Sequence, residues 1–264
     1  AALVMAAAFK EGYRGPVFLQ GDHFSLDSAD DLKWLEDLAL QVIESGFYQI
    51  DIDGSHLFNQ KAENLTDFHT PNAEITGKLI KSIRDMQPRD VHIALGGEVG
   101  EIGGRNTSVD DLVAFQVVLQ KHLSDTTPGL DKISAQTGTT HSGIVLPDGT
   151  TGRMSVDFDL ISDLSRQARL SGWSGLVQHG ASTLQFEDLA RLPQAGVIEV
   201  HLATQIQNIL FDHPAFPLDL REQMKRELVK STRSAEGDHL DTSDALSDAQ
   251  RFYQARWAAW GIYK

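Results

Sequence analysis

The sequence lacks cysteine, an excess of basic residues and any long apolar run. With no cysteine among 264 residues, disulfides and thiolate chemistry are excluded, and any metal must be held by His, Asp or Glu. The formal net charge of −14 and the lack of a basic block argue against nucleic acid as a partner. No apolar run approaches the roughly 18 to 20 residues that span a bilayer, so no membrane partner is expected. These absences favour a small-molecule partner and a cytoplasmic protein.

Several common catalytic signatures are missing as well. The sequence contains no G-x-S-x-G elbow, no H-E-x-x-H pair, no P-loop and no G-x-G-x-x-G turn. A serine hydrolase or a dinucleotide-binding enzyme therefore loses its usual sequence support.

Compact apolar segments recur along the chain and predict strands that are buried on both faces. The predicted strands are 16–22, 47–53, 90–98, 131–138, 175–180 and 197–204. Amphipathic stretches between them predict helices over 28–47, 72–86 and 108–123, and the first residues also read as a helix. Strands that alternate with helices indicate parallel pairing and the α/β class.

The repeated unit predicts a (β/α)8 TIM barrel that lacks its first one or two strands in the chain as given, since six strands are found where a full barrel has eight. We assign the barrel core to residues 1–218. Residues 219–264 alternate charged and apolar side chains and predict a C-terminal helical extension.

Polar side chains collect where the predicted strands end. They are Asp22, His23, Asp51, Asp53, Glu98, His141, His179 and Thr204. In a βα barrel this is the edge where the catalytic loops converge. Three histidines with a carboxylate and no thiolate suit Zn²⁺ or another divalent first-row ion, which would act as a Lewis acid on a carbonyl.

Other readings of these residues stay open. A single histidine at a strand end is more often a hydrogen-bonded structural residue, and we assign His69, His92 and His122 to that role. Asp22 is suited both to capping the following helix and to general acid/base catalysis, and its spacing does not choose between them.

Five motifs occur in a fixed order: PVFLQGDHF, GFYQIDIDGSHLFNQKAEN, GGEVGEIGG, ISAQTGTTHSG and VQHGAST. From about residue 16 to about residue 208 they resemble the motifs of the class II, metal-dependent fructose-bisphosphate and tagatose-bisphosphate aldolases. The chain is thus identified as a divergent member of that family, and its predicted strands correspond to strands 3 to 8 of the family barrel.

The resemblance implies a Zn²⁺ or other divalent ion held by His23, His141 and His179, with Glu98 as an alternate ligand. A monovalent cation is a second candidate ion. Asp22 matches the aspartate that exchanges a proton with the hydroxyl at the carbon–carbon bond being made or broken.

Asp53 and Ser55 match a polar segment that lines the metal site of the family. By analogy we expect these two side chains to orient the metal ligands.

The chain departs from the family pattern after EIGG. Where the family has acidic residues that act in proton transfer, this chain has Arg105 and Asn106. The identity of the carbon base is therefore open. Arg105 is suited to bidentate contact with a substrate carboxylate or phosphate, and a solvated loop arginine is the alternative.

A second departure concerns the phosphate-binding segments of the family. The glycine-rich loop HGGSG is replaced by His179-Gly180-Ala181-Ser182-Thr183, and a strand pattern like N-x-D-T becomes His201-Leu202-Ala203-Thr204. A remodelled anion pocket is expected. Its substrate-binding residues are then predicted to be Gly180, Ser182, His201 and Thr204.

Together these features predict a metal-dependent aldolase of carbohydrate metabolism. This lyase would reversibly cleave a C–C bond of a ketose or ketose phosphate through an enediolate stabilised by the metal. A retro-aldol epimerase of sugars or sugar acids is the alternative on the same site. A non-catalytic partner subunit of an aldolase complex is the alternative of another class. We expect a homo-oligomer.

Overall fold

The computed structural model describes residues 2–26, 28–100, 104–140, 143–152, 154, 156–234 and 246–256. The chain divides into two compact units. The sheet unit comprises residues 1–137, 157–178 and 192–199, and the second unit comprises 138–156, 179–191 and 200–264.

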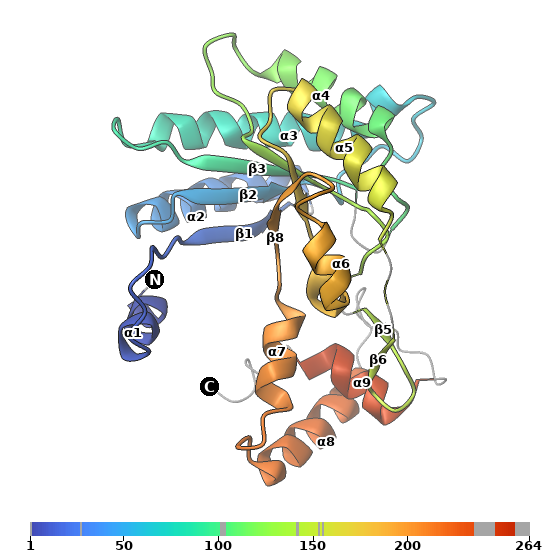
Figure 1. The fold of residues 1–264 in the computed structure, drawn as a ribbon. Helices are drawn as coiled ribbons and strands as arrows, with labels where there is room; N and C mark the ends of the chain where they lie inside the picture. Colours follow the sequence, from blue (N-terminus) through green and yellow to red (C-terminus); the bar gives the residue numbers. More distant parts are fainter. Residues whose placement is uncertain are drawn as a thin grey trace. The chain divides into compact units, whose positions relative to one another are not determined.

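A curled six-stranded sheet forms the centre of the sheet unit (Figure 1). Its strands are β1 (Gln20–Ser25), β2 (Gln49–Asp53), β3 (Ala94–Val99), β4 (Lys132–Ala135), β7 (Leu176–Gln178) and β8 (Val197–Val200), in the spatial order β1-β2-β3-β4-β7-β8. Each neighbouring pair from β1 to β7 is parallel. Strands that follow one another in sequence and in space are the arrangement of part of a βα barrel.

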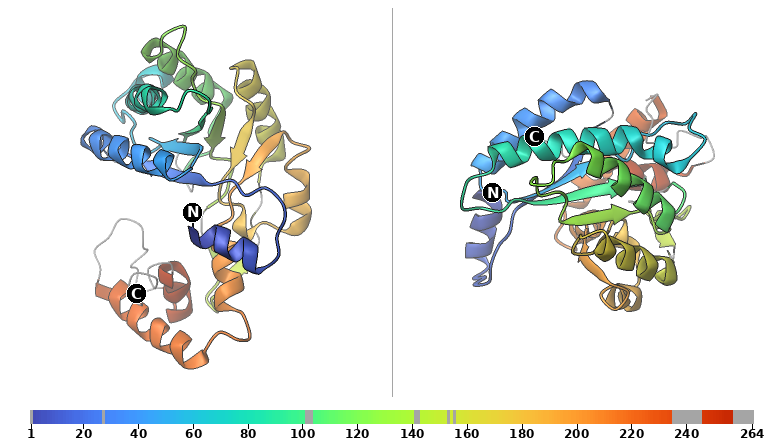
Figure 2. Two further views of the ribbon diagram at one scale, coloured as in Figure 1. Left: turned by 90° about the vertical axis from the view of Figure 1, so that its left-hand side faces the viewer. Right: turned by 90° about the horizontal axis from the view of Figure 1, so that it is seen from above.

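Helices cover the outer face of the sheet. They are α2 (Leu32–Glu44), α3 (Leu65–Met86), α4 (Val109–His122) and α5 (Phe158–Leu170). Consecutive helices in this series pack against one another, as Figures 1 and 2 show. The unit also contains α1 (Ala2–Lys10) and the short 3-10 turn η1 (Ala29–Asp31).

Polar side chains set the starts of two of these helices. The Asn64 side chain accepts the backbone N–H of Asp67 at the start of α3, and Ser108 and Asp111 form a capping box at the start of α4. Each cap satisfies backbone donors that a helix start leaves exposed. The Asn64 cap explains why α3 begins at Leu65 and not at residue 72 as predicted, with Pro71 inside its early turns.

Strand β2 shows how the sheet separates an apolar face from a polar one. Ile50 and Ile52 are fully buried and alternate with Asp51 and Asp53, which are also buried. Since successive side chains of a strand point to opposite faces, one face of β2 is apolar and the other carries carboxylates. The core is made of such strand residues with helix residues, among them Leu35, Leu79, Ile80, Ile83, Leu95, Leu112 and Phe115.

The second unit is described by itself. It contains the antiparallel pair β5 (Ile144–Val145) and β6 (Thr151–Gly152), the 3-10 turn η2 (Ala181–Thr183), α6 (Phe186–Arg191), α7 (Thr204–Phe211), α8 (Leu218–Ser234) and α9 (Asp248–Ala255). Phe211, Met224, Leu228 and Ala255 form its apolar cluster. At the start of α9, the Gln250 side chain donates to the Val145 carbonyl at 2.8 Å. The helical extension predicted for 219–264 is described only in its α8 and α9 parts.

The α/β class and all six predicted strands are confirmed, with shifted ends. The last strand ends at Val200 and not at residue 204, because α7 begins at Thr204, and β1 and β3 begin at Gln20 and Ala94 and not at residues 16 and 90. Closure into an eight-stranded barrel and the boundary at residue 218 stay predictions. In the described part of the chain, no helix has both the length and the apolar character needed to span a membrane.

The packing of α4 gives a test of the core. Phe115 is fully buried, and we expect Phe115→Ala to lower the free energy of unfolding by about 3–5 kcal/mol, because the truncation leaves a cavity. Val117, on the same helix, is 46% exposed and serves as the control. Urea unfolding followed by circular dichroism measures both variants, and equal losses for Phe115→Ala and Val117→Ala would contradict this placement of the core.

Candidate metal and catalytic site

A β-bulge places Asp22 and His23 on strand β1. The register between β1 and β2 pairs Gly21 with Ile50 and then Phe24 with Ile52, so that two residues of β1 oppose Asp51. Such a bulge bends a strand and changes the direction of its side chains. His23 has φ +51°, and it alone has positive φ among the described residues other than glycine. A backbone angle of this kind costs about 1–3 kcal/mol and is concentrated at functional sites.

His23 lies between two carboxylates of neighbouring strands. Its Nδ1 is 3.1 Å from Oδ2 of Asp53 and 3.7 Å from Oε2 of Glu98. Asp53 ends β2 and Glu98 lies near the end of β3, so parallel pairing brings the three side chains to one edge of the sheet. The structure thus brings together two of the predicted metal ligands and one of the residues predicted to orient them.

Asp53 is held by several donors besides His23. Its Oδ1 accepts the backbone N–H of Ser55 at 3.0 Å and the Ser55 hydroxyl at 2.7 Å, and its Oδ2 accepts the Ser25 hydroxyl at 3.0 Å. Burial alone would raise the pKa of Asp53, but the interactions with His23 and Ser55 outweigh it and hold the pKa well below its ordinary value. Asp53 is therefore ionised and fixed in orientation at neutral pH.

Glu98 shows the opposite electrostatic behaviour. Burial raises its pKa well above the ordinary value, and the negative charges of Asp53, Asp22 and Asp51 raise it further. Carboxylate oxygens of Asp22 and Asp51 lie within 4.8 Å of each other, so negative charge is concentrated here. A cation at this edge would offset that charge, and imidazole with carboxylate oxygens is a donor set that suits divalent first-row ions. The residues present therefore fit a metal ion.

His179 and His201 are close neighbours within the second unit. Their rings stack with centroids 4.4 Å apart, and ring nitrogens of the two lie within 4.8 Å of each other. His179 directly follows β7 and is 2% exposed, and its carbonyl accepts the Thr139 hydroxyl at 2.9 Å. His201 directly follows β8.

The other predicted residues of the second unit lie on short elements. Gly180 has φ +64°, and a Cβ added there would come within 2.7 Å of the Thr139 hydroxyl, so that this turn favours glycine. Ser182 is buried within η2, and Thr204 is the first residue of α7. His141 lies outside the described residues.

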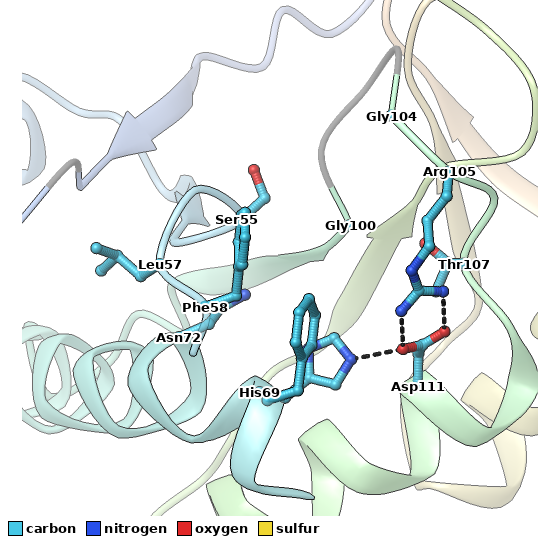
Figure 3. A pocket seen from close by; sticks show the side chains of 11 residues that line it. Ser55, Leu57, Phe58, His69, Asn72, Gly100, Gly104, Arg105, Thr107 and Asp111 are labelled. Atoms are coloured by element: carbon cyan, nitrogen blue, oxygen red, sulfur yellow. Dashed lines mark hydrogen bonds and ion pairs between the residues drawn. The ribbon is translucent and has the colours of Figure 1, made fainter. Parts of the chain in front are cut away.

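Arg105 pairs with a residue of its own unit (Figure 3). Its Nη1 and Nη2 donate to Asp111 at 2.8 Å and 2.6 Å, and Asp111 also contacts Nε2 of His69 at 2.8 Å. This contact agrees with the structural role predicted for His69. These residues line a pocket of about 240 Å³ that also includes Ser55 and Phe68. The neighbouring Asn106 is exposed.

Sequence reasoning missed a charged cluster inside the sheet. Lys132 on β4 and Gln20 on β1 each contact the side chains of Asp51 on β2 and Glu199 on β8. Asp51 is among the polar residues at the predicted strand ends, but its sequence position indicates no particular role. The available signal was a lysine and a glutamate within segments that otherwise predict apolar strands.

A parallel α/β sheet that gathers imidazole and carboxylate groups where its strands end is typical of barrel enzymes. The family profile described as "Fructose-bisphosphate aldolase class-II" matches residues 1–256. The chain therefore belongs to the class II fructose-bisphosphate aldolase family, which confirms the resemblance of its five motifs and places it among aldolase-type lyases.

Two solved structures give weaker similarities. Fructose-bisphosphate aldolase from Campylobacter jejuni is 16% identical with a TM-score of 0.49, and the match covers 98% of this chain and 74% of that one. Homocysteine methyltransferase MmuM from Escherichia coli is 14% identical with a TM-score of 0.42, covering 78% and 81%.

The Asp111 cluster predicts how stability depends on pH. Burial would raise the pKa of Asp111, but hydrogen bonds from His69, Arg105 and Ser108 hold it well below its ordinary value. The pKa of an aspartate in an unfolded chain is about 4. A carboxylate whose pKa is lower in the folded protein stabilises the fold at pH values above about 4, and this stabilisation is lost as the pH falls below that value. We expect Asp111→Asn to lower the free energy of unfolding at pH 7 and to weaken its decline between pH 5 and pH 3.

Urea unfolding at several pH values measures this effect. Asp110→Asn, at the exposed neighbouring position of the same helix, is the matched control and should keep the wild-type decline. An Asp111→Asn protein with the wild-type pH dependence would contradict the assignment.

Proposed function

We propose that this protein is a metal-dependent aldolase that reversibly cleaves a C–C bond of a ketose or ketose phosphate. The observation that carries the proposal is the position of His23, held by a bulge between Asp53 and Glu98 at the end of neighbouring parallel strands. Family membership supplies the class of reaction, and this geometry supplies donors of the type that the reaction requires.

The proposed ligands of the ion are His23, His141 and His179, with Glu98 as an alternate ligand, and the proposed ion is Zn²⁺ or another divalent metal. In the tautomer of His23 with its proton on Nδ1, that proton is donated to Asp53 and Nε2 keeps the lone pair that a metal ion requires. When bound, the ion supplies a Lewis acid that polarises the ketose carbonyl.

Asp22 is proposed to hold and move the proton of the substrate hydroxyl next to the breaking bond. Asp22 lies within the bulge, whose conformation sets the directions of Asp22 and His23 together. A general acid/base in this position contributes roughly 10²–10⁴-fold to rate.

Substrate recognition is proposed to involve Gly180, Ser182, His201 and Thr204. Ser182 supplies a hydroxyl, while the positive φ of Gly180 and the nearby Thr139 side chain favour glycine at that position. Arg105 and Asn106 stay candidates for substrate contact on the loop after β3. Arg105 already makes a bidentate ion pair with Asp111, so an anion would have to compete with that carboxylate.

The activity is tested by incubating the protein with Zn²⁺ and a panel of ketoses and ketose phosphates while the released aldehyde is trapped. We expect cleavage that stops after treatment with a chelator and returns when Zn²⁺ is added. Asp22→Asn should lower kcat by roughly 10²–10⁴-fold, because the amide cannot exchange the proton.

The exposed Asp90→Asn variant is the control for Asp22→Asn and should cleave at the wild-type rate. Formation of a rearranged ketose with no free aldehyde would replace cleavage by epimerisation. Absence of both products and of stoichiometric metal would favour the non-catalytic partner subunit.

The contact between His23 and Asp53 gives a separate prediction about the ion. We expect Asp53→Asn to weaken Zn²⁺ binding about 10–100-fold, because the carboxylate that orients a metal-bound imidazole is lost. Calorimetric titration of metal-free protein measures the affinity. Asp85→Asn, on the exposed side of α3, should bind Zn²⁺ as the wild type does. Unchanged affinity in Asp53→Asn would remove Asp53 from the metal site.

A further inference from the structure

The interior of the sheet contains a charged layer next to Asp22. Nζ of Lys132 lies 3.1 Å from Oδ1 of Asp51 and 2.5 Å from Oε1 of Glu199. The Gln20 amide donates to Oδ2 of Asp51 at 2.7 Å and to Oε1 of Glu199 at 3.0 Å. The side chain of Lys132 is 5% exposed and that of Asp51 is 11% exposed, so this ion pair is sheltered from water. We call these four residues the Lys132 layer.

A glycine on the strand between them makes the ion pair possible. Asp51, Gly96 and Lys132 occupy the same register on β2, β3 and β4. A Cβ at Gly96 would lie 2.3 Å from Oδ1 of Asp51 and 3.1 Å from Cε of Lys132. Lys132 therefore crosses β3 to reach a carboxylate two strands away, through space that any other residue at position 96 would fill.

Stability alone does not account for this layer. Interior positions of βα barrels are usually filled by Val, Ile and Leu, and replacing a buried ion pair by apolar residues is often neutral or stabilising. A lysine that joins carboxylates of β2 and β8 does fix those side chains in position. A positioning role is therefore the better explanation, and it requires that one of the fixed groups lie near the chemistry.

Asp51 meets that requirement. One of its carboxylate oxygens lies within 4.8 Å of a carboxylate oxygen of Asp22, and the β1 bulge faces Asp51. Gln20, which holds Asp51, is also two residues before Asp22 on the same strand. The layer thus reaches Asp22 both through the β1 backbone and through the Asp51 side chain.

We propose that Lys132 is a positioning residue, which with Gln20 holds the Asp51 carboxylate in place and so fixes the carboxylate of Asp22 for proton transfer. The proposal rests on the proposed function of Asp22. Removal of the Lys132 charge leaves Asp51 and Asp22 to repel each other without the cation that holds Asp51. Asp51 then shifts, and Asp22 loses its fixed position.

Two variants separate positioning from folding. Lys132→Met leaves the buried Asp51 carboxylate without its cation and should lower the melting temperature. In the triple variant Lys132→Met/Asp51→Asn/Glu199→Gln the layer is neutral, and the melting temperature should return close to that of the wild type. We expect kcat for ketose cleavage to stay at least about 10-fold below wild type in the triple variant, because no ammonium group anchors the side chain at position 51 beside Asp22. KM should stay within about 2-fold, because substrate binding is unaffected. Lys121→Met, at an exposed position of α4, is the control.

A crystal structure of the triple variant gives a readout that does not depend on activity. We expect the Asp22 carboxylate to occupy a different position or several positions. If the wild type cleaves ketoses and the folded triple variant has wild-type kcat, the proposal is overturned while the proposed function stands. If the wild type cleaves no ketose, the proposed function fails; an Asp22 carboxylate in its wild-type position in the variant would then overturn the positioning role as well.

Discussion

Negative charge buried on neighbouring parallel strands is the constraint on which the candidate site depends. Asp51, Asp53 and Glu98 are each less than a tenth exposed, although a buried carboxylate is costly unless it is paired or hydrogen-bonded. Asp53 is compensated by hydrogen bonds with His23 and two serines. Asp51 is compensated by an ion pair with Lys132 and a hydrogen bond from Gln20. At Glu98 the burial and the surrounding charge raise the pKa, and a bound cation is the natural counter-charge.

Backbone features make these pairings possible. The bulge inserts one extra residue into β1 and turns His23 into the left-handed region, which directs its ring toward Asp53 and Glu98. Gly96 opens a passage through which Lys132 reaches Asp51. Neither feature improves the regularity of the sheet. Both serve the placement of charged side chains, which is how functional sites often use strained or empty positions.

The sequence predicted the strands well because alternation of apolar segments with amphipathic helices is set by burial, which acts on every residue of an element. Ends of elements were predicted less well, because caps such as Asn64 and the start of α7 at Thr204 depend on local hydrogen bonds. The strands β5 and β6 were not predicted because they are only two residues long and carry no periodicity. No range was predicted for the helices α5, α6 and α7 either.

Parts of the site followed from the sequence for a similar reason. Parallel strands bring their carboxyl ends to one edge, so His23, Asp53 and Glu98 could be expected together. The Lys132 layer could not, since it depends on register across three strands and on the missing side chain of Gly96. A charged residue inside an apolar segment signals a partner but does not identify it.

The environment of Arg105 bears on how an anionic substrate is recognised. An arginine on a loop after a strand end is suited to binding a phosphate group. In this chain, however, both Nη groups of Arg105 already donate hydrogen bonds to Asp111, whose side chain is buried. If Arg105 turned toward a ligand, the buried Asp111 carboxylate would lose its ion pair. Only the interactions with His69 and Ser108 would then compensate its charge. Arg105 would therefore bind a phosphate only if that interaction were stronger than its ion pair with Asp111. An uncharged group of a ligand in the pocket beside Arg105 would carry no such cost, because this pocket is lined in part by Leu57, Phe58 and Phe68.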